Sequence, residues 1–180
     1  MKFESIADIY AANENICSKF RAVLGGVTAD EASALPEGEK WTIEQIVEHV
    51  SLVNTAMTKI CTRLMTKSKD EGKTSNGGVT ISDNFFTRSS ELIGLKVEAP
   101  DFVQPEGGKS IRVSLAVINE VDASLAGLKP LFETYDADTH KFPHPFFGEL
   151  SATEWLVLLG GHEARHTAQI ERILSGIRAD

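Results

Sequence analysis

The segment Ser151–Ile177 reads SATEWLVLLGGHEARHTAQIERILSGI, and its pattern predicts a long amphipathic helix. It opens with a capping box, in which the Ser151 hydroxyl accepts a hydrogen bond from the backbone N–H of Glu154 and the Glu154 side chain reaches back. Apolar residues and two histidines then recur at spacings of three and four, and so form one stripe. The stripe contains Trp155, Leu159, His162, His166, Ile170, Ile173 and Ile177. This helix, which we place near residues 151–175, has to bury its stripe against other elements.

Three further segments repeat the pattern and predict the helices against which the stripe packs. They lie near residues 3–24, 42–66 and 110–134. Gly25 and Gly26 end the first helix, because glycine accepts the left-handed conformation that closes helices. The second begins at a capping box formed by Thr42 and Gln45. The sequence therefore predicts an all-α fold, a four-helix bundle with long connecting loops and no sheet of more than two short strands.

The connection between the second and third helices has three parts. Residues 67–80 contain three glycines and many polar residues, a composition that predicts a mobile loop. Residues 83–95 are predicted to form a helix of their own, and a loop follows from Pro100 to Gly108. The length of 180 residues suits one domain with its own core, so we expect a single domain over residues 1–180.

Charge and hydropathy disfavour two classes of partner. The net charge is −8, and no basic cluster longer than Lys67-Ser68-Lys69 is present, whereas nucleic-acid binding depends on a basic face. No apolar run reaches the roughly 18 residues that a membrane span requires. The N-terminus does not have the basic region of a secretory signal. We therefore expect a cytoplasmic protein whose partner is a small molecule, with Cys17 and Cys61 as reduced, buried thiols.

Three histidines fall on core-facing stripes and predict a metal site. His162 and His166 are four residues apart and project from one face of their helix. Buried imidazoles need partners, since an unsatisfied polar group costs about 1–3 kcal/mol, and one divalent metal satisfies both. His49 lies on the core-facing side of the second helix, so it adds a third nitrogen. Three protein ligands leave one position open, which is the pattern of catalytic sites. The alternative is a set of histidines that hydrogen-bond to neighbouring side chains or water.

The string from His162 to His166 also spells H-E-x-x-H, the signature of zincin metalloproteases. A zincin needs a further ligand downstream. The metzincin form has glycine and histidine at the positions that Gln169 and Arg172 occupy here. A protease is therefore disfavoured.

Three stretches resemble the DinB/YfiT-like family of metal-binding four-helix-bundle proteins. WTIEQIVEH, from Trp41 to His49, resembles the family's second-helix motif, a tryptophan followed about two turns later by a ligand histidine. HPFFGEL, from His144 to Leu150, resembles its H-P-x-x-G-x-L segment. The run from His162 to Ile170 resembles its H-x-x-R-H-x-x-Q-I pattern.

The resemblance implies an up-down-down-up bundle and a divalent metal (zinc, nickel, iron or manganese) on His49, His162 and His166. It also implies a homodimer. Because relatives include metal-dependent thiol transferases and a maleylpyruvate isomerase-like branch, it implies a low-molecular-weight thiol as a second cofactor. The glycine-containing segment 67–80 departs from the family pattern, and we expect it to cover or reshape the site.

The position or role of four further residues near the motifs can also be predicted. Gln169 lines the pocket or orients a ligand, or else lies on the surface, and Glu163 faces a neighbouring helix or solvent. His144 is expected to serve entry into the last helix, and His140 to be exposed in a loop.

Two functions remain open at this level. The first is a metal-dependent enzyme of the thiol S-transferase type that acts on small molecules. The second is a non-catalytic bundle that binds a small molecule or a protein, with a structural or vestigial metal. An open coordination position that faces a cavity favours the enzyme.

Overall fold

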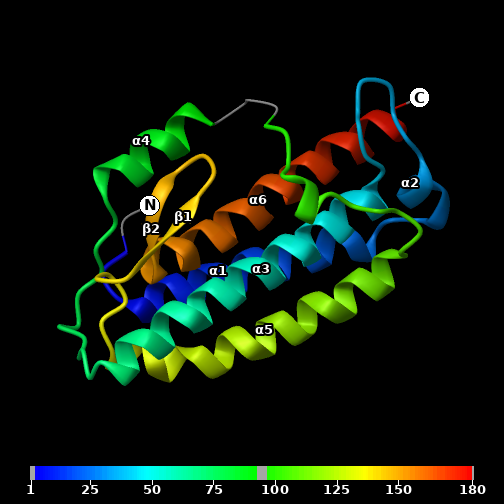
Figure 1. Ribbon diagram of the computed structural model, residues 1–180. Helices are drawn as coiled ribbons and strands as arrows, with labels where there is room; N and C mark the ends of the chain where they lie inside the picture. Colours follow the sequence, from blue (N-terminus) through cyan, green and yellow to red (C-terminus); the bar gives the residue numbers. More distant parts are fainter. Residues whose placement is uncertain (1–2, 93–96, 180) are drawn as a thin grey trace.

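Four long helices run side by side in a computed structural model that describes residues 3–92 and 97–179 (Figure 1). The bundle helices are α1 (Ile6–Gly25), α3 (Ile43–Asp70), α5 (Ile111–Thr134) and α6 (Ala152–Ile177). The connections contain α2 (Ala29–Ser33), α4 (Asp83–Glu91), the 3-10 helix η1 (Asp101–Val103) and a hairpin of β1 (Lys141–His144) and β2 (Gly148–Ser151). The four-helix bundle is thus confirmed, and the sheet has only these two short antiparallel strands among the described residues.

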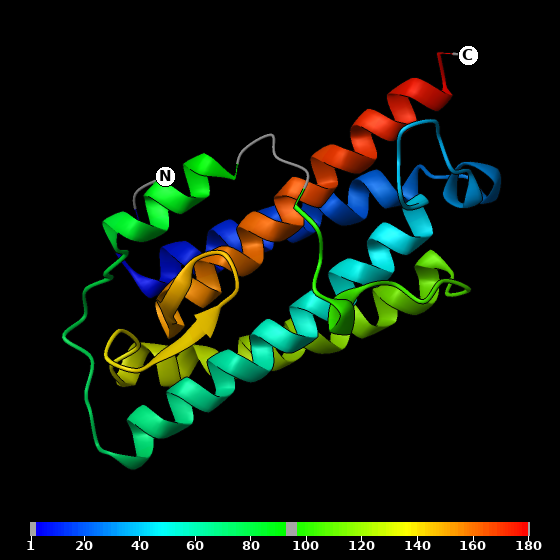
Figure 2. The ribbon, with the colours of Figure 1, turned by 45° about the horizontal axis from the view of Figure 1, so that its top comes forward.

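Two apolar clusters establish the direction of each helix. One joins the start of α1 and the end of α3 to the end of α5 and the start of α6, and includes Ile9, Met65, Phe132 and Leu156. The other occupies the opposite end of the bundle. The topology is therefore up-down-down-up. Because α3 and α5 are parallel, the connection between them must return along the bundle, and the described parts of this crossover, residues 71–92 and 97–110, carry α4 and η1 over one side of it (Figure 2).

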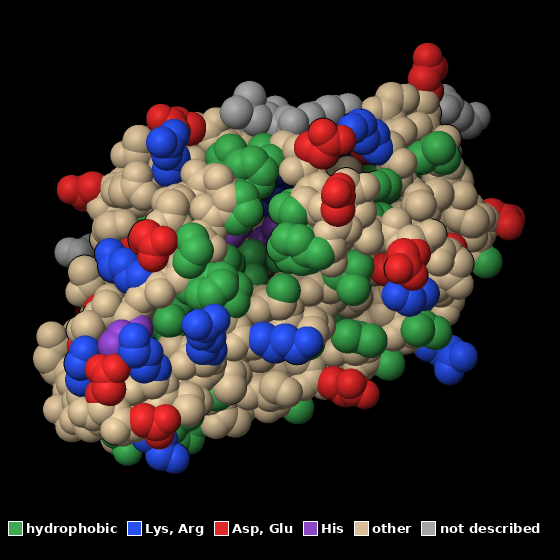
Figure 3. Space-filling model, viewed as in Figure 1, with side chains coloured by type: hydrophobic (Ala, Val, Ile, Leu, Met, Phe, Trp, Pro, Cys, Tyr) green, Lys and Arg blue, Asp and Glu red, His purple; other side chains and the backbone are tan. Residues whose placement is uncertain are grey.

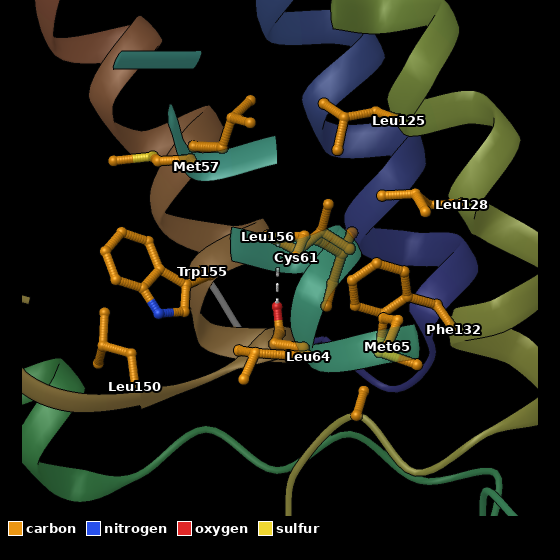
Figure 4. Close-up of a cluster of buried hydrophobic side chains, with 14 of the residues drawn as sticks. Met57, Cys61, Leu64, Met65, Leu125, Leu128, Phe132, Leu150, Trp155 and Leu156 are labelled. Atoms are coloured by element: carbon orange, nitrogen blue, oxygen red, sulfur yellow. Dashed lines mark hydrogen bonds between the residues drawn. The ribbon is translucent and has the colours of Figure 1, made fainter. Parts of the chain in front are cut away.

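Figure 4 shows the first cluster from within. Met57, Cys61, Leu64 and Met65 of α3 lie between side chains of α5 and α6. Both cysteines are free thiols, as predicted, but only Cys61 is buried, whereas Cys17 is half-buried. Burial raises the pKa of Cys61 to about 12, so this thiol stays protonated and serves as a small apolar side chain.

The first part of the connection between α3 and α5 differs from the loop that the sequence predicted. α3 continues to Asp70, so the first residues of the predicted loop are helical. The segment that follows is hydrogen-bonded to the end of α5: Ser75 N–H donates to Thr134 O over 3.0 Å, and Thr74 forms a β-bridge with Tyr135. Residues 67–80 therefore do not cover the site, contrary to the expectation. α4 agrees with the helix predicted over residues 83–95, of which 93–95 lie outside the described residues.

None of the helices within residues 3–92 and 97–179 has the length and apolar character needed to span a bilayer.

Glu154 joins the starts of two helices, and its charge should make stability depend on pH. The side chain is buried and accepts hydrogen bonds from Ser151 N–H, Ser82 N–H and Ser82 O–H. Burial alone would raise the pKa of Glu154, but these donors bring it below its ordinary value of 4.5. A lowered folded-state pKa stabilises the fold above the unfolded value, and that contribution is lost as the pH falls through the folded value. Urea unfolding of wild type and Glu154→Gln should differ most near pH 7, and the difference should shrink as the pH falls through the lowered folded-state pKa of Glu154. A difference that is constant with pH would contradict this prediction.

Gly160 allows α1 and α6 to approach closely. A Cβ placed there would lie 3.0 Å from Asn13 Cγ, whose amide donates to Leu156 O over 3.0 Å. Gly160→Ala should break that hydrogen bond and force Asn13 aside, at a combined cost of about 2 kcal/mol. Helix propensity offsets about 1 kcal/mol of this cost, so the free energy of unfolding should fall by about 1 kcal/mol. Gly127 of α5 is exposed with open space around it, so Gly127→Ala should raise that free energy by about 1 kcal/mol through helix propensity. Urea unfolding of the two variants checks the opposite signs, and an equal gain in both would refute the close contact.

Candidate metal centre

The three predicted histidines meet where α3 and α6 face one another. His162 Nε2 lies 3.2 Å from His49 Nε2 and 3.2 Å from His166 Nε2. One ligand nitrogen from each residue lies within 4.8 Å of the others. Two nitrogens that bind one tetrahedral metal at about 2.1 Å are about 3.4 Å apart. The observed separations therefore have the scale of a shared metal site.

His49 is held by the crossover. Its Nδ1 lies 2.7 Å from Val103 O in η1, and the ring packs against Trp41 with centroids 4.8 Å apart. A carbonyl oxygen can only accept, so Nδ1 must carry the proton. The unprotonated Nε2 of His49 then faces the other two histidines.

His166 is oriented by a polar chain that ends on Glu39. Gln169 Nε2 donates to Glu39 Oε2 over 3.1 Å, and Glu39 also pairs with Arg172 at 2.9 Å. Because a carboxylate only accepts, the amide nitrogen of Gln169 belongs on that side, and its oxygen faces His166 Nδ1 at 2.9 Å. His166 therefore also carries its proton on Nδ1 and presents a bare Nε2. Gln169 thus orients the ring of His166, which is one of the roles expected for it, and it does not line the cavity.

With these tautomers, the hydrogen-bonding needs of the three Nε2 atoms cannot all be met by the protein itself. His162 Nε2 faces two bare nitrogens and can donate a proton to only one of them. Its Nδ1 is buried and has no hydrogen-bond partner among the described residues. At least one contact therefore brings two lone pairs together, although buried polar groups are normally satisfied. A cation at the centre accepts all three Nε2 lone pairs, so the donor set fits a divalent metal.

Protonation of the three imidazoles is unfavourable, so protons do not take the place of that cation near pH 7. Burial lowers the pKa of His49, lowers that of His162 well below its ordinary range, and lowers that of His166 to about 3. The positive charge of Arg165 acts in the same direction on all three. The imidazoles are therefore neutral near pH 7, which is the form that binds metals.

The histidines open into a cavity of about 720 Å³. All three line it, and apolar side chains form most of the rest of its wall. Figure 3 looks into this hollow, where hydrophobic side chains surround histidine atoms at the bottom. The wall combines α1, α3, α4, α6, the end of the crossover and the hairpin. A ligand at the metal would thus be surrounded by apolar groups, with one side open to solvent.

Glu163 does not belong to the histidine centre. It is buried against α3, where its Oε2 accepts from Asn54 over 2.8 Å, and burial raises the pKa of the carboxyl group. This agrees with the prediction that it faces a neighbouring helix. It does not line the cavity, so it cannot serve as the general base of a zincin.

The remaining histidines lie apart from the centre. His144 ends β1, where its Nδ1 accepts from Phe146 N–H over 3.1 Å and so shapes the hairpin before α6, in line with the prediction. Burial lowers the pKa of His144 to about 4. The expectation for His140 was wrong: its side chain is only 12% exposed, and its Nε2 lies 3.0 Å from Glu71 Oε2. The bend that brings residue 140 to the end of α3 has no periodic signal in the sequence.

Comparisons with known proteins agree with the fold and with these motifs. The sequence profile of the DinB superfamily matches residues 14–170. The uncharacterized protein YuaE of Bacillus subtilis (strain 168) is 26% identical over 155 residues, which cover 83% of this chain and 87% of YuaE. The crystal structure of TT2238, a four-helix bundle protein, aligns with a TM-score of 0.59 at 22% identity, covering 92% of this chain and 96% of that one. At that identity, the likeness to TT2238 concerns the fold alone.

Proposed function

The chain belongs to the DinB superfamily, and on that premise we propose that it is a metal-dependent enzyme of the thiol S-transferase type that acts on small molecules. One observation supports the proposal: the Nε2 atoms of three neutral histidines converge on the wall of an open apolar cavity. A structural site is usually closed by four protein ligands, whereas three ligands beside a cavity leave room for a reactant.

The three imidazole side chains narrow the choice of metal. Imidazole suits zinc, nickel and iron, whereas manganese prefers carboxylate oxygens. No carboxylate belongs to the group that His49, His162 and His166 form in the described residues. Zinc, nickel or iron is therefore favoured over manganese.

A divalent cation held there would lower the pKa of a bound thiol or water and so supply a nucleophile near pH 7. The residues of the chain would orient the metal ligands and exclude water. Val103 O and Gln169 Oε1 fix the tautomers of His49 and His166 before any ligand arrives. The apolar wall excludes water from the reactant and strengthens the charge interactions at the metal.

The direct test compares zinc-loaded and metal-free protein in the conjugation of low-molecular-weight thiols to electrophilic aromatic chlorides. Thiol consumption is followed together with metal content. We expect turnover that requires one bound metal per chain and disappears with a chelator. A rate that is the same with and without metal would contradict the proposal.

Gln169→Ala should weaken zinc binding by about tenfold or more, because partners of ligand histidines typically contribute 10–100-fold to metal affinity. The matched control is Glu171→Ala on the same helix, since Glu171 is exposed and pairs with Lys19 on the outside of the bundle. Competition with a chromophoric chelator measures both affinities. If the two variants bind zinc equally well, the orienting role of Gln169 is wrong.

A further inference from the structure

Three phenylalanines around the cavity are unusually exposed. Phe86 of α4 is 44% exposed, Phe102 of η1 is 74% exposed, and Phe146 of the hairpin turn is 39% exposed. They come from three separate segments, yet all three line the same cavity. Single exposed apolar residues are common on protein surfaces, but an apolar group that rims a concave site marks a binding region.

The apolar character continues inward from this rim. Met57 and Ile60 of α3, Phe85 of α4 and Trp155 of α6 line the cavity behind the three phenylalanines. The volume of about 720 Å³ lies in the range of sites that enclose drug-sized ligands. A small hydrophilic thiol would leave most of this wall uncovered, so the wall suits the apolar body of another reactant.

The charge of the cavity is concentrated at the histidine end. Arg165, on α6 between the two ligand histidines, lines the cavity there, and a divalent cation on the histidines would add to its charge. Of the described lining residues, the acidic one is Glu98, whose side chain is 79% exposed and pairs with Lys40 at 3.3 Å. Arg165 and a bound cation would together make the histidine end positive, whereas apolar side chains form most of the rest of the wall.

We propose that the cavity binds an amphiphilic carboxylate, with its carboxylate at Arg165 and the histidines and its apolar body against the aromatic wall. A medium-chain fatty acid or an arylalkanoic acid has this chemistry. The inference deepens the proposed function by naming its substrate class, and it depends on that function only for the cation at the inner end.

Calorimetric titration of the zinc-loaded full chain with decanoate tests the ligand class. Decanoate should bind about tenfold or more tightly than butyrate, because it buries more methylene groups. It should also bind more tightly than decyltrimethylammonium, which has the same tail and the opposite charge. Equal affinity for decanoate and butyrate, or a preference for the cationic amphiphile, would overturn the proposal.

Two variants test the two ends of the cavity. Phe102→Ser should weaken decanoate binding by about fivefold, whereas Val113→Ser, on a 45% exposed site of α5 outside the cavity, should leave it unchanged. Arg165→Gln should reduce the preference for decanoate over decyltrimethylammonium. Equal effects of Phe102→Ser and Val113→Ser would rule out the aromatic rim.

A separate zinc titration of the same samples keeps the two proposals apart. If zinc binds and decanoate fails these tests, the substrate class is wrong and the metal site stands. If zinc does not bind, but decanoate still depends on chain length and on Phe102, the proposed function is wrong and the amphiphile site stands.

Discussion

Zinc affinity should fall by about a thousandfold or more when His49, His162 or His166 is replaced by alanine. Loss of a residue that merely orients a metal ligand already costs about 10–100-fold, and loss of the ligand itself removes a coordinate bond. The expected effect is similar for all three positions because each contributes one Nε2 to the same centre. Competition with a chromophoric chelator gives the affinities, and far-ultraviolet circular dichroism confirms that each variant is folded.

His144→Ala is the matched control for this series. His144 is a half-buried histidine on the cavity wall, but its Nδ1 accepts a backbone hydrogen bond within the hairpin turn. Its replacement should therefore leave zinc affinity within about threefold of wild type, since it supplies no ligand. A zinc affinity that depends on His144 as strongly as on His49 would show that the assignment of the metal ligands is wrong.

The bundle and the histidine pair could be predicted because both follow from helical periodicity. Spacings of three and four place His162 and His166 on the core face of one helix, and the same phase brings His49 to the core face of another. Capping boxes at Thr42 and Ser151 located two helix starts within one residue of those observed. Each of these signals lies within one continuous segment, so no knowledge of the tertiary structure was needed.

The parts that sequence reasoning missed depend on contacts between distant segments. Val103 acts through its backbone oxygen, which no side-chain pattern can reveal, and Glu39 lies in a short connection with no periodicity. The hairpin strands have four residues each, too few for alternation to be distinguished from chance. The cavity was also missed, because its wall combines segments that are brought together only when the crossover returns along the bundle.

The crossover between α3 and α5 therefore shapes both the histidine cluster and the cavity. Parallel neighbours α3 and α5 require a long return path, and that path supplies η1, which fixes His49, and α4, which forms part of the cavity wall. Gly107 N–H donates to buried Glu48 Oε2 over 2.9 Å, so the end of the crossover is anchored one residue before His49 on α3. Access to the cavity and the orientation of His49 thus depend on the same segment.

Zinc at a thousandfold excess over its Kd should stabilise the wild type against unfolding by about 4 kcal/mol, because ligand that binds only the native state shifts the equilibrium by mass action. His166→Ala, whose zinc affinity should be lower by about a thousandfold or more, should gain only about 0.4 kcal/mol or less at the same zinc concentration. Calorimetric melting of both proteins, each with zinc and with a chelator, provides the four measurements. A zinc-dependent shift in His166→Ala as large as that in wild type would place the metal elsewhere.

The metal-free wild type separates a catalytic metal from a structural one. Two apolar clusters, centred on residues such as Phe132 and Ile170, extend along the bundle without any contribution from the histidine ligands. At about 25 cal/mol per Å² of buried apolar surface, clusters of this extent should dominate the free energy of folding. Chelator-treated wild type should therefore unfold in one cooperative transition, at the temperature of His166→Ala, while metal-dependent turnover disappears. A structural metal predicts the opposite pair of results: a chelator-treated protein without a cooperative transition, and no turnover with any thiol and electrophile in the zinc-loaded protein.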